Sequence, residues 1–317
     1  MARCMRVADK GPGRKCRVSC ALEKARQGGY EMKKLGLIAN CTKPRAGEVV
    51  RCIDFAARRM GLKICADPST ARLLKMCKCM KIDRIISSVD AVIAIGGDGT
   101  MLRVVRELNG RDIPVIGVNI GGLGFLTSVA EGDLELALEC LSDDRYVESV
   151  RSIADCSVER GNRVIGKYRA LNDIVITSGA TSRIMTLGVS IGRNDVTSYV
   201  SDGIIVAMPT GSTGHSLSAG GPIVTPESRV MVISVICPHT LSSRPLVIPD
   251  SSKIVVELIQ CAGRVPLTVD GQVGRLLAAG DKLKISKSER GVRFIHLPGH
   301  SYFNVLRQKL RWSGSNR

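Results

Sequence analysis

Over the first 143 residues, short apolar runs alternate with segments of helical spacing. A continuous apolar run bounded by Gly or polar residues is typical of a strand covered on both faces, whereas an apolar residue every three or four positions predicts a helix. This alternation favours a parallel sheet with right-handed crossovers. The predicted strands are 34–40, 62–65, 91–95 and 115–118, and the predicted helices are 47–60, 71–80 and 100–108.

After residue 143 the runs become short, rich in β-branched residues and separated by Gly, Pro, Asp or Ser, which is the pattern of an all-β domain. Its predicted strands are 154–159, 164–170, 173–177, 185–191, 203–207, 230–235, 254–259, 265–269 and 282–285, with a helix at 301–310. We therefore predict an α/β N-terminal domain with a parallel sheet and an all-β C-terminal domain. The predicted parts are a basic extension at 1–32, domains at 33–143 and 144–294, and a tail at 295–317.

Charge adds little to this picture. The chain of 317 residues, long enough for about two domains, has a formal charge of +17. Residues 1–31 carry +5 of it and residues 282–317 carry +8. The sequence has no zinc-finger spacing and no stacking-aromatic motif, so we expect no nucleic-acid partner. We expect the folded protein to begin near Met32, where a strand opens.

The cysteines and the apolar runs bear on the compartment. The 12 cysteines are scattered without a C-x-x-C pair, which favours reduced thiols over a disulfide scaffold or a zinc site. No apolar run reaches the roughly 18 residues of a membrane span, and the N-terminus has no secretory apolar core. We therefore expect a cytoplasmic protein with no membrane association. Four separated histidines form no metal motif, so no residue is assigned as a metal ligand.

The most informative segment is a glycine turn that follows the third strand. The apolar run 91–95 leads into Gly96-Gly97-Asp98-Gly99 and then into a predicted helix. Such a turn lets backbone N–H groups approach a phosphate, and the helix N-terminus adds partial positive charge. The turn lacks the G-K-[ST] of a Walker A loop and is not G-x-G-x-x-G. It therefore predicts a phosphate site of another kind.

Asp98 is unexpected there, because a carboxylate repels phosphate. It fits if it accepts a proton from an attacking hydroxyl or helps to hold a divalent cation. The alternative is that Asp98 only caps the following helix.

Two further clusters are rich in glycine. Asn119–Leu126 follows the strand at 115–118, at the sheet edge where ligands bind in parallel sheets. On its own, a tight turn explains it equally well. Residues 210–222 hold five hydroxyl side chains and four glycines. That composition suits a loop that binds a polyhydroxylated, phosphorylated ligand, with a flexible surface loop as the alternative.

Together these motifs resemble the NAD kinase family, over about residues 33–312. G-G-D-G-T alone also occurs in diacylglycerol kinases, sphingosine kinases and phosphofructokinases, whereas T-G-S-T-x-x-S-x-S-A-G-G-P is more selective. The matching segments occur in the family's order and are 96–100, 119–126, 172–173, 202–203, 209–222, 238–246 and 270–272.

The resemblance implies that ATP or polyphosphate, with a divalent metal such as Mg²⁺, phosphorylates the adenosine-ribose 2′-hydroxyl of NAD. It also implies a site between the domains, a tail that packs on the first domain, and a homodimer or homotetramer. By position, Asp98 would be the base, Gly99 and Arg103 would border the phosphates, and Asn172 and Asp173 would bind ribose hydroxyls. The rest of the dinucleotide site would be Arg183, Asp202, Thr213, Gly214, His215, Ser216, Leu217, Ser218 and Gln272.

Three positions depart from the family pattern. Gly214-His215 stands where many relatives have Ala-Tyr, Val200 replaces a frequently basic residue, and Asp173 replaces a commoner Glu. Two alternatives remain at this stage. A lipid or small-sugar kinase would share the glycine turn but lack the 210–222 loop, and a non-catalytic NAD(P) sensor would not need Asp98. The sequence does not choose between ATP and polyphosphate or between NAD and NADH.

Overall fold

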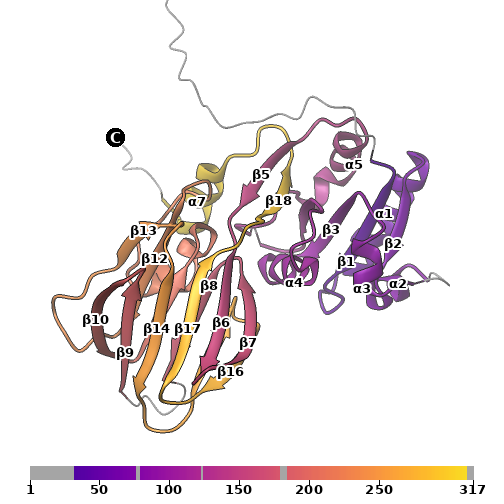
Figure 1. Cartoon of the computed structure of the whole chain (residues 1–317). Coiled ribbons are helices and arrows are strands. Elements are labelled where there is room, and N and C mark those ends of the chain that lie inside the picture. The colour runs from indigo at the N-terminus through magenta and orange to yellow at the C-terminus, as the bar shows by residue number, and fades with distance from the viewer. Residues whose placement is uncertain (1–31, 76–78, 123, 179–183, 313–317) are drawn as a thin grey trace, which may run out of the picture.

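The computed structural model describes residues 32–75, 79–122, 124–178 and 184–312. Three six-stranded sheets build two domains (Figure 1). The first part of the chain forms β1 Lys34–Ala39, α1 Ala46–Arg59, β2 Lys63–Ala66, α2 Pro68–Leu73, α3 Ile82–Ile86, β3 Ala91–Gly96, α4 Asp98–Leu108, β4 Val115–Asn119, the 3₁₀ turn η1 Glu131–Asp133, α5 Leu134–Ser142 and β5 Val147–Arg151.

The second part is mostly strands. It forms β6 Ala154–Arg160, β7 Arg163–Ala170, β8 Asp173–Thr177, β9 Met185–Ile191, β10 Asn194–Ser201, β11 Gly203–Ala207, the 3₁₀ turn η3 Pro209–Thr213, α6 His215–Ser218, β12 Val230–Ile236, β13 Leu246–Pro249, β14 Ile254–Gln260, β15 Val265–Val269, β16 Val273–Leu277, β17 Asp281–Lys287, β18 Val292–His296 and α7 Tyr302–Leu310.

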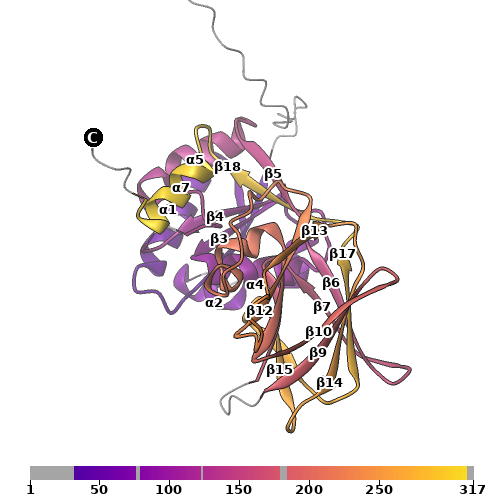
Figure 2. The same ribbon diagram turned by 90° about the vertical axis from the view of Figure 1, so that its left-hand side faces the viewer.

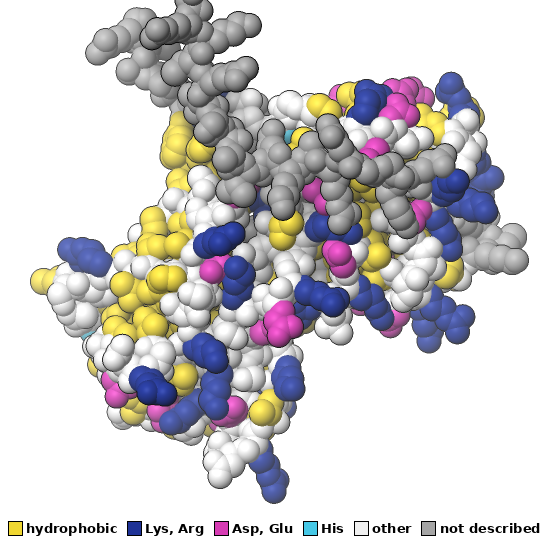
Figure 3. Space-filling view, turned by 45° about the horizontal axis from the view of Figure 1, so that its top comes forward, with side chains coloured by type: hydrophobic (Ala, Val, Ile, Leu, Met, Phe, Trp, Pro, Cys, Tyr) yellow, Lys and Arg dark blue, Asp and Glu magenta, His cyan; other side chains and the backbone are white. Residues whose placement is uncertain are grey.

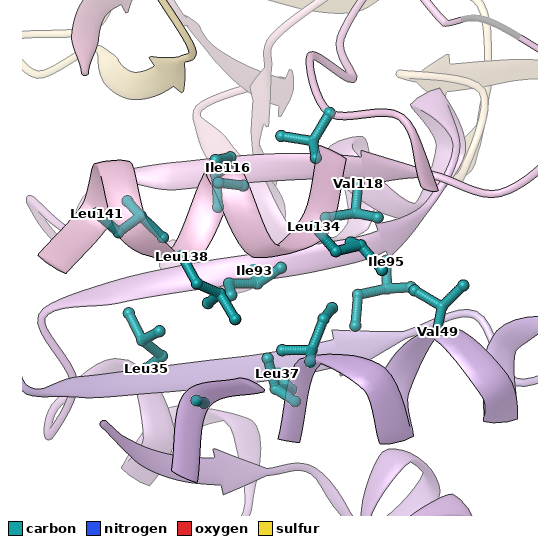
Figure 4. Close-up of a cluster of buried hydrophobic side chains, with 14 of the residues drawn as sticks. Leu35, Leu37, Val49, Ile93, Ile95, Ile116, Val118, Leu134, Leu138 and Leu141 are labelled. Atoms are coloured by element: carbon teal, nitrogen blue, oxygen red, sulfur yellow. The ribbon is translucent and has the colours of Figure 1, made fainter. Parts of the chain in front are cut away.

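The first sheet has the order β2-β1-β3-β4-β18-β5 and is parallel up to β18, with β5 antiparallel at its edge. Alternate residues of its central strands point to opposite faces. On one face Leu37 and Ile93 pack with α1 and α5 (Figure 4), and on the other Val92 packs with α3 and α4. Because both faces are covered, the strands are continuously apolar, as the sequence predicted.

The second domain is a sandwich of two antiparallel sheets with a shared apolar core. One sheet has the order β10-β9-β14-β17-β6-β7 and the other β13-β12-β11-β8-β15-β16, and Figures 1 and 2 show the two face to face. The predicted fold class is thereby confirmed. Residues that point inward alternate with polar ones, as in β6, where Ala154, Cys156 and Val158 are buried.

Three segments tie the domains together. Strand β5 follows the predicted limit at residue 143, and strand β18 crosses the predicted limit at residue 294. Both strands pair into the first sheet. Helix α7 lies against the first domain, with Lys309 Nζ 5.9 Å from the centroid of the Phe125 ring. The numerical domain limits stay predictions.

The predicted helix at 71–80 is wrong. Helix α2 ends at Leu73, because Lys75 adopts a positive φ of 53° that an α-helix does not allow, and a separate short helix, α3, follows at Ile82. Residues 76–78 lie outside the described part of the chain. The sequence pattern also predicted no strand at β10 or β16, because their side chains are largely exposed and show little apolar periodicity.

The surface of the described residues carries charges of both signs. Lys and Arg side chains are spread over both domains on the face in Figure 3, interleaved with Asp and Glu. No helix within the described ranges is long and apolar enough to cross a membrane. The eight cysteines with described surroundings are all free thiols.

Candidate active site

The glycine turn joins β3 to α4 at the carboxyl end of the parallel sheet. A Cβ on Gly96 would lie 2.2 Å from Thr100 Oγ1, so only glycine fits between this strand end and the helix. Gly97 is the N-cap residue and has open space around its Cα. The turn therefore leaves the first turn of α4 accessible to an anion.

Asp98 is the first residue of α4, and its side chain turns toward the second glycine cluster. Its Oδ2 accepts a hydrogen bond from Phe125 N at 3.0 Å, and its Oδ1 accepts one from Leu126 N at 2.9 Å. No side chain caps α4, so the capping alternative is wrong. Because a carboxylate oxygen can accept two hydrogen bonds, each oxygen keeps a position for a substrate proton.

The second glycine cluster makes room for this carboxylate. A Cβ on Gly124 would lie 2.2 Å from Asp98 Oδ1 and 2.7 Å from Thr127 Oγ1. The Thr127 hydroxyl is buried and has no hydrogen-bond partner. The cluster is therefore more than a turn, because it places two amides and an unpaired hydroxyl around Asp98.

Across the domain junction, β8 and the β15–β16 turn bring two acids together. Asp270 accepts hydrogen bonds from the amides of Leu171, Asn172 and Asp173 at 3.0, 2.7 and 3.1 Å. Desolvation raises the pKa of Asp270, and those amides and the charge of Arg106 oppose the rise. Burial, with the neighbouring Asp270 charge, raises the pKa of Asp173 to about 7.

Asn172 has a free acceptor. Its Oδ1 is buried without a partner, and a buried polar atom of this kind is costly unless a ligand or water satisfies it. Together with Asp173 it offers an amide and a carboxyl at the sandwich end of the junction.

The 209–222 loop packs directly on Asn172. A Cβ on Gly211 would lie 2.1 Å from Asn172 O, so glycine is required for this approach. A Cβ built on Gly214 would lie 4.0 Å from Asp173 Oδ2, which places the loop beside that carboxyl. Thr210 Oγ1 is buried and unpaired, like Asn172 Oδ1.

The other predicted loop residues differ in exposure. Ser216 is fully buried, and its Oγ lies 3.1 Å from Ser234 Oγ, so its hydroxyl fastens the loop to β12. Leu217 and Thr213 are half-buried, and the Thr213 hydroxyl makes only a 3.5 Å bond to Thr210 O. His215 and Ser218 are exposed.

Gln272 joins the two halves of the site. Its Nε2 donates to Gly99 O at 2.7 Å, and its Oε1 accepts from Arg106 Nη1 at 2.7 Å. Because Gly99 follows Asp98 and Gln272 lies two residues after Asp270, this bridge brings the glycine turn next to the Asp173–Asp270 pair. Asp98, Gly99, Asn172, Asp173 and Gln272 are thus all at the junction.

Two predicted residues, Arg103 and Asp202, are not gathered with the others. Arg103 Nη2 is 3.7 Å from Asp67 Oδ2, so this guanidinium is turned toward the start of α2. Asp202 precedes β11 at the Gly203 end, whereas Asp173 pairs with Ala207 at the other end of that strand. The two acids are therefore at opposite ends of β11. Arg183 lies outside the described residues.

Some residues escaped the sequence analysis. The Asp270-Gly271-Gln272 motif was noted without a role for Asp270, although an Asp-Gly after a strand is a turn signal that commonly ties backbone amides. Arg106 was missed because only contacts across domains reveal it. His296 is buried in β18, where burial and its neighbours His300 and Arg151 lower its pKa to about 3.

A glycine turn with an oriented acid, facing a sandwich that offers unpaired polar groups, defines a two-domain kinase with a nucleotide-type acceptor. Family models agree. Residues 35–146 match the ATP-NAD kinase N-terminal domain, and residues 171–297 match the ATP-NAD kinase C-terminal domain. The chain belongs to the NAD kinase family and carries its catalytic domain, and the lipid-kinase and sensor alternatives are not favoured.

Individual relatives support this assignment. The NAD kinase of Syntrophotalea carbinolica is 41% identical over 283 residues, which cover 89% of this chain and 99% of the relative. An NAD kinase from Archaeoglobus fulgidus in complex with ATP is 25% identical, with a TM-score of 0.70, and covers 89% of this chain and 100% of that one. Yeast NADH kinase complexed with NADH shares the fold at 24% identity and a TM-score of 0.83, covering 91% and 90% of the two chains.

Proposed function

We propose that this chain phosphorylates the 2′-hydroxyl of the adenosine ribose of NAD, with ATP as donor and Asp98 as the general base. One observation carries the proposal. The Asp98 carboxylate is oriented by two backbone amides from another segment, keeps free acceptor positions and lies beside an open glycine turn. A purely structural acid needs no such access.

The glycine turn is the place for the donor phosphates. Backbone N–H groups at the start of α4 and at Gly97 can approach phosphate oxygens without a Cβ in the way. The archaeal relative's complex with ATP supports ATP as the donor. Polyphosphate presents the same oxygens and is the competing donor.

We propose that Mg²⁺ arrives with ATP. Mg²⁺ is commonly held by substrate phosphates with one or two carboxylates and several waters. Among the described residues, no group of three or more His, Cys, Asp or Glu side chains could hold a metal ion. Asp98 is the carboxylate of the glycine turn and therefore the side chain available to such an ion. The metal would offset charge on the transferred phosphoryl group.

The sandwich side would hold the dinucleotide. Asn172 Oδ1 and Thr210 Oγ1 are buried and unpaired, so a ligand hydroxyl would satisfy atoms that otherwise cost free energy. Asp173 would bind a second ribose hydroxyl. Exposed His215 and Ser218 would contact the rest of the ligand, in place of the Ala-Tyr pair of many relatives.

The chemical step follows from these positions. Asp98 accepts the proton of the 2′-hydroxyl while that oxygen forms a bond to the γ-phosphorus of ATP. The bond between the γ-phosphorus and the bridging oxygen breaks, and ADP leaves with its electron pair. A positioned base typically contributes about 10²–10⁴-fold to such a step.

The direct test incubates the purified chain with ATP, Mg²⁺ and NAD and identifies the product by mass and by NADP-specific enzymatic reduction. An NAD analogue that lacks the adenosine 2′-hydroxyl should remain unmodified. Phosphorylation of that analogue, or no NADP from NAD, would overturn the proposal. Parallel reactions with polyphosphate and with NADH establish the donor and the redox form of the acceptor.

We also propose a cytoplasmic enzyme that works as a homodimer or homotetramer. Light scattering on the purified chain measures its mass in solution, and a monomer at working concentration would contradict the second statement.

A further inference from the structure

We propose that a cavity between α4 and the edge of the sandwich is a second ligand site, which binds a small organic phosphate with an apolar ring. The cavity measures about 700 Å³. Figures 1 and 2 both place α4 beside β6 and β7, the elements that form its walls. Its size falls within the range of about 300–1,000 Å³ that small-molecule sites occupy.

The cavity lies on the far side of the Gln272 bridge from Asp98. Its walls are formed by the last turns of α4, by β6 and β7, by β17 and by the start of β16, and they include neither the 209–222 loop nor the glycine turn. It is therefore separate from the proposed NAD site. Arg106 connects the two regions, because it lines the cavity and donates to Gln272.

The charges that line the cavity leave Lys167 without an acidic partner among the described residues, and the acid near Arg106 is Asp270, which does not line the cavity. Arg169 Nε lies 3.1 Å from Asp155 Oδ1, and Lys284 Nζ lies 2.8 Å from Glu159 Oε2, so these two are neutralised. Lys167 makes no ion pair with any described residue, and Arg106 is bonded to the neutral amide of Gln272. A phosphate monoester carries about −1.5 to −2 at pH 7, which matches this surplus.

Arg106 can bind an anion without releasing Gln272. A guanidinium has five N–H donors, and one of them is used by Gln272 Oε1. The Arg169 Nε–H is buried, and its ion-pair geometry with Asp155 leaves it without a hydrogen bond. Arg106 therefore keeps donors for an anion, and the Asp155 carboxylate that lines the cavity is paired with Arg169.

The rest of the cavity wall can bind a ring but offers no catalytic group. Tyr168 and Val273 supply apolar surface beside the cations. Cys156 is also a lining residue, but its side chain belongs to the sandwich core and burial raises its pKa to about 12, so its thiol is a poor nucleophile. The lining thus offers binding groups without a catalytic one.

The experiment titrates the full chain with phenyl phosphate, a dianion with one aromatic ring, by calorimetry in the absence and presence of saturating NAD. We expect saturable binding that persists with NAD and is tighter than that of inorganic phosphate. Lys167→Ala should weaken it about tenfold or more, as for loss of a charge-assisted hydrogen bond, and Lys167→Arg should keep it. Lys253→Ala, which removes another exposed lysine without an ion pair, should leave it unchanged.

Three outcomes would overturn the proposal. They are no binding of phenyl phosphate to the parent chain, equal binding by the parent and Lys167→Ala, and binding that NAD abolishes, which would place the probe in the dinucleotide site. The melting temperature of each variant reports whether it is folded. Since Lys167 lies outside the proposed NAD site, NADP formation by Lys167→Ala should match the parent, so failure of this proposal and failure of the NAD kinase proposal are separable.

Discussion

Asp98 and Asp270 are both held by backbone amides, yet they end in opposite situations. Asp98 takes two amides from a segment 27 and 28 residues away, one on each oxygen, and stays half-buried at an open turn. Asp270 takes three amides from β8 and the residues before it and is half-buried beside the buried Asp173. The first arrangement orients an acid for a substrate, and the second uses an acid to shape the backbone.

The two carboxylates differ in the hydrogen-bond acceptor positions that remain free on their oxygens. Each Asp98 oxygen accepts one hydrogen bond and keeps an acceptor position, whereas Asp270 Oδ1 accepts two and thereby fixes the amides of Asn172 and Asp173. Asp173 is a third case, because its carboxyl is buried and close to a like charge. We infer that Asp98 acts on the reacting atoms, Asp173 contacts the ligand, and Asp270 is a positioning residue. The following predictions test that division, from the largest effect to the smallest.

Asp98→Asn should have the largest effect. The amide removes the proton acceptor and can keep only one of the two backbone hydrogen bonds, so kcat should fall about 10²–10⁴-fold. NAD binding, measured by calorimetry, should survive within a few-fold. Asp83→Asn is the control, because Asp83 is exposed and makes only a 3.6 Å surface pair with Arg111. A parent-like kcat for Asp98→Asn would remove Asp98 from the mechanism.

Gly124→Ala should displace the Asp98 carboxylate while leaving the carboxyl group itself in place. The new Cβ would lie 2.2 Å from Asp98 Oδ1, so the acid or its loop must shift. A misplacement of about 1 Å costs up to about 100-fold in rate, and we expect kcat to fall about 10- to 100-fold. Gly122→Ala adds the same methyl where no atom lies within 4 Å, and its kcat should stay near the parent value. Equal kcat values for the two variants would show that the Asp98 position is not critical.

Asp270→Asn should act on binding and stability instead of kcat. Asn tolerates the positive φ of 52° at this position. Its NH₂ group, however, cannot accept the backbone hydrogen bonds that one of the two Asp270 oxygens now accepts. The free energy of unfolding should fall by about 1–3 kcal/mol, and KM for NAD should rise. Asp83→Asn is again the control, because the side chain of Asp83 is exposed and makes only a 3.6 Å pair with Arg111, and it should change neither. A fall in kcat with unchanged KM would contradict the positioning role of Asp270.

Much of this fold could be predicted from local patterns. The strands β3 and β8 were found because each is a continuous apolar run between polar or glycine residues. The exposed strands β10 and β16 were missed, since pairing with neighbours and not apolar periodicity keeps them extended. The place of β18 in the first sheet depends on a return across the whole second domain, which no local pattern encodes.

The site divides in the same way. Asp98 stands out because it lies in a glycine turn directly after an apolar strand of a parallel sheet, whereas Asn172 was assigned only through the family resemblance. The Gln272 bridge to Gly99 joins residues 173 positions apart, and the role of Arg106 depends on that bridge. Ser216 looked like a ligand residue by composition, but its burial against Ser234 depends on how the loop folds onto β12. Long-range contacts therefore decide which hydroxyls and cations are free.

The prediction with the smallest effect on kcat concerns the pH dependence of stability. The pKa of Asp173 is raised to about 7 in the folded chain, from an ordinary value of 3.8. Between these values the unfolded chain releases a proton that the folded chain keeps. The free energy of unfolding without ligand should therefore fall as pH rises from about 4 to 7, by at most about 1.4 kcal/mol per pH unit. Denaturant unfolding at several pH values measures this slope.

Two variants locate the proton. Asp173→Asn should flatten the fall between pH 4 and 7, because the group that binds the extra proton is gone. Asp270→Asn removes the neighbouring charge that helps to raise the pKa of Asp173, so the fall should end at a lower pH. A slope in Asp173→Asn as steep as in the parent would assign the proton to another group. The description of Asp173 and Asp270 as a pair that holds a proton would then fail, and so would the division between that pair and the open acid Asp98.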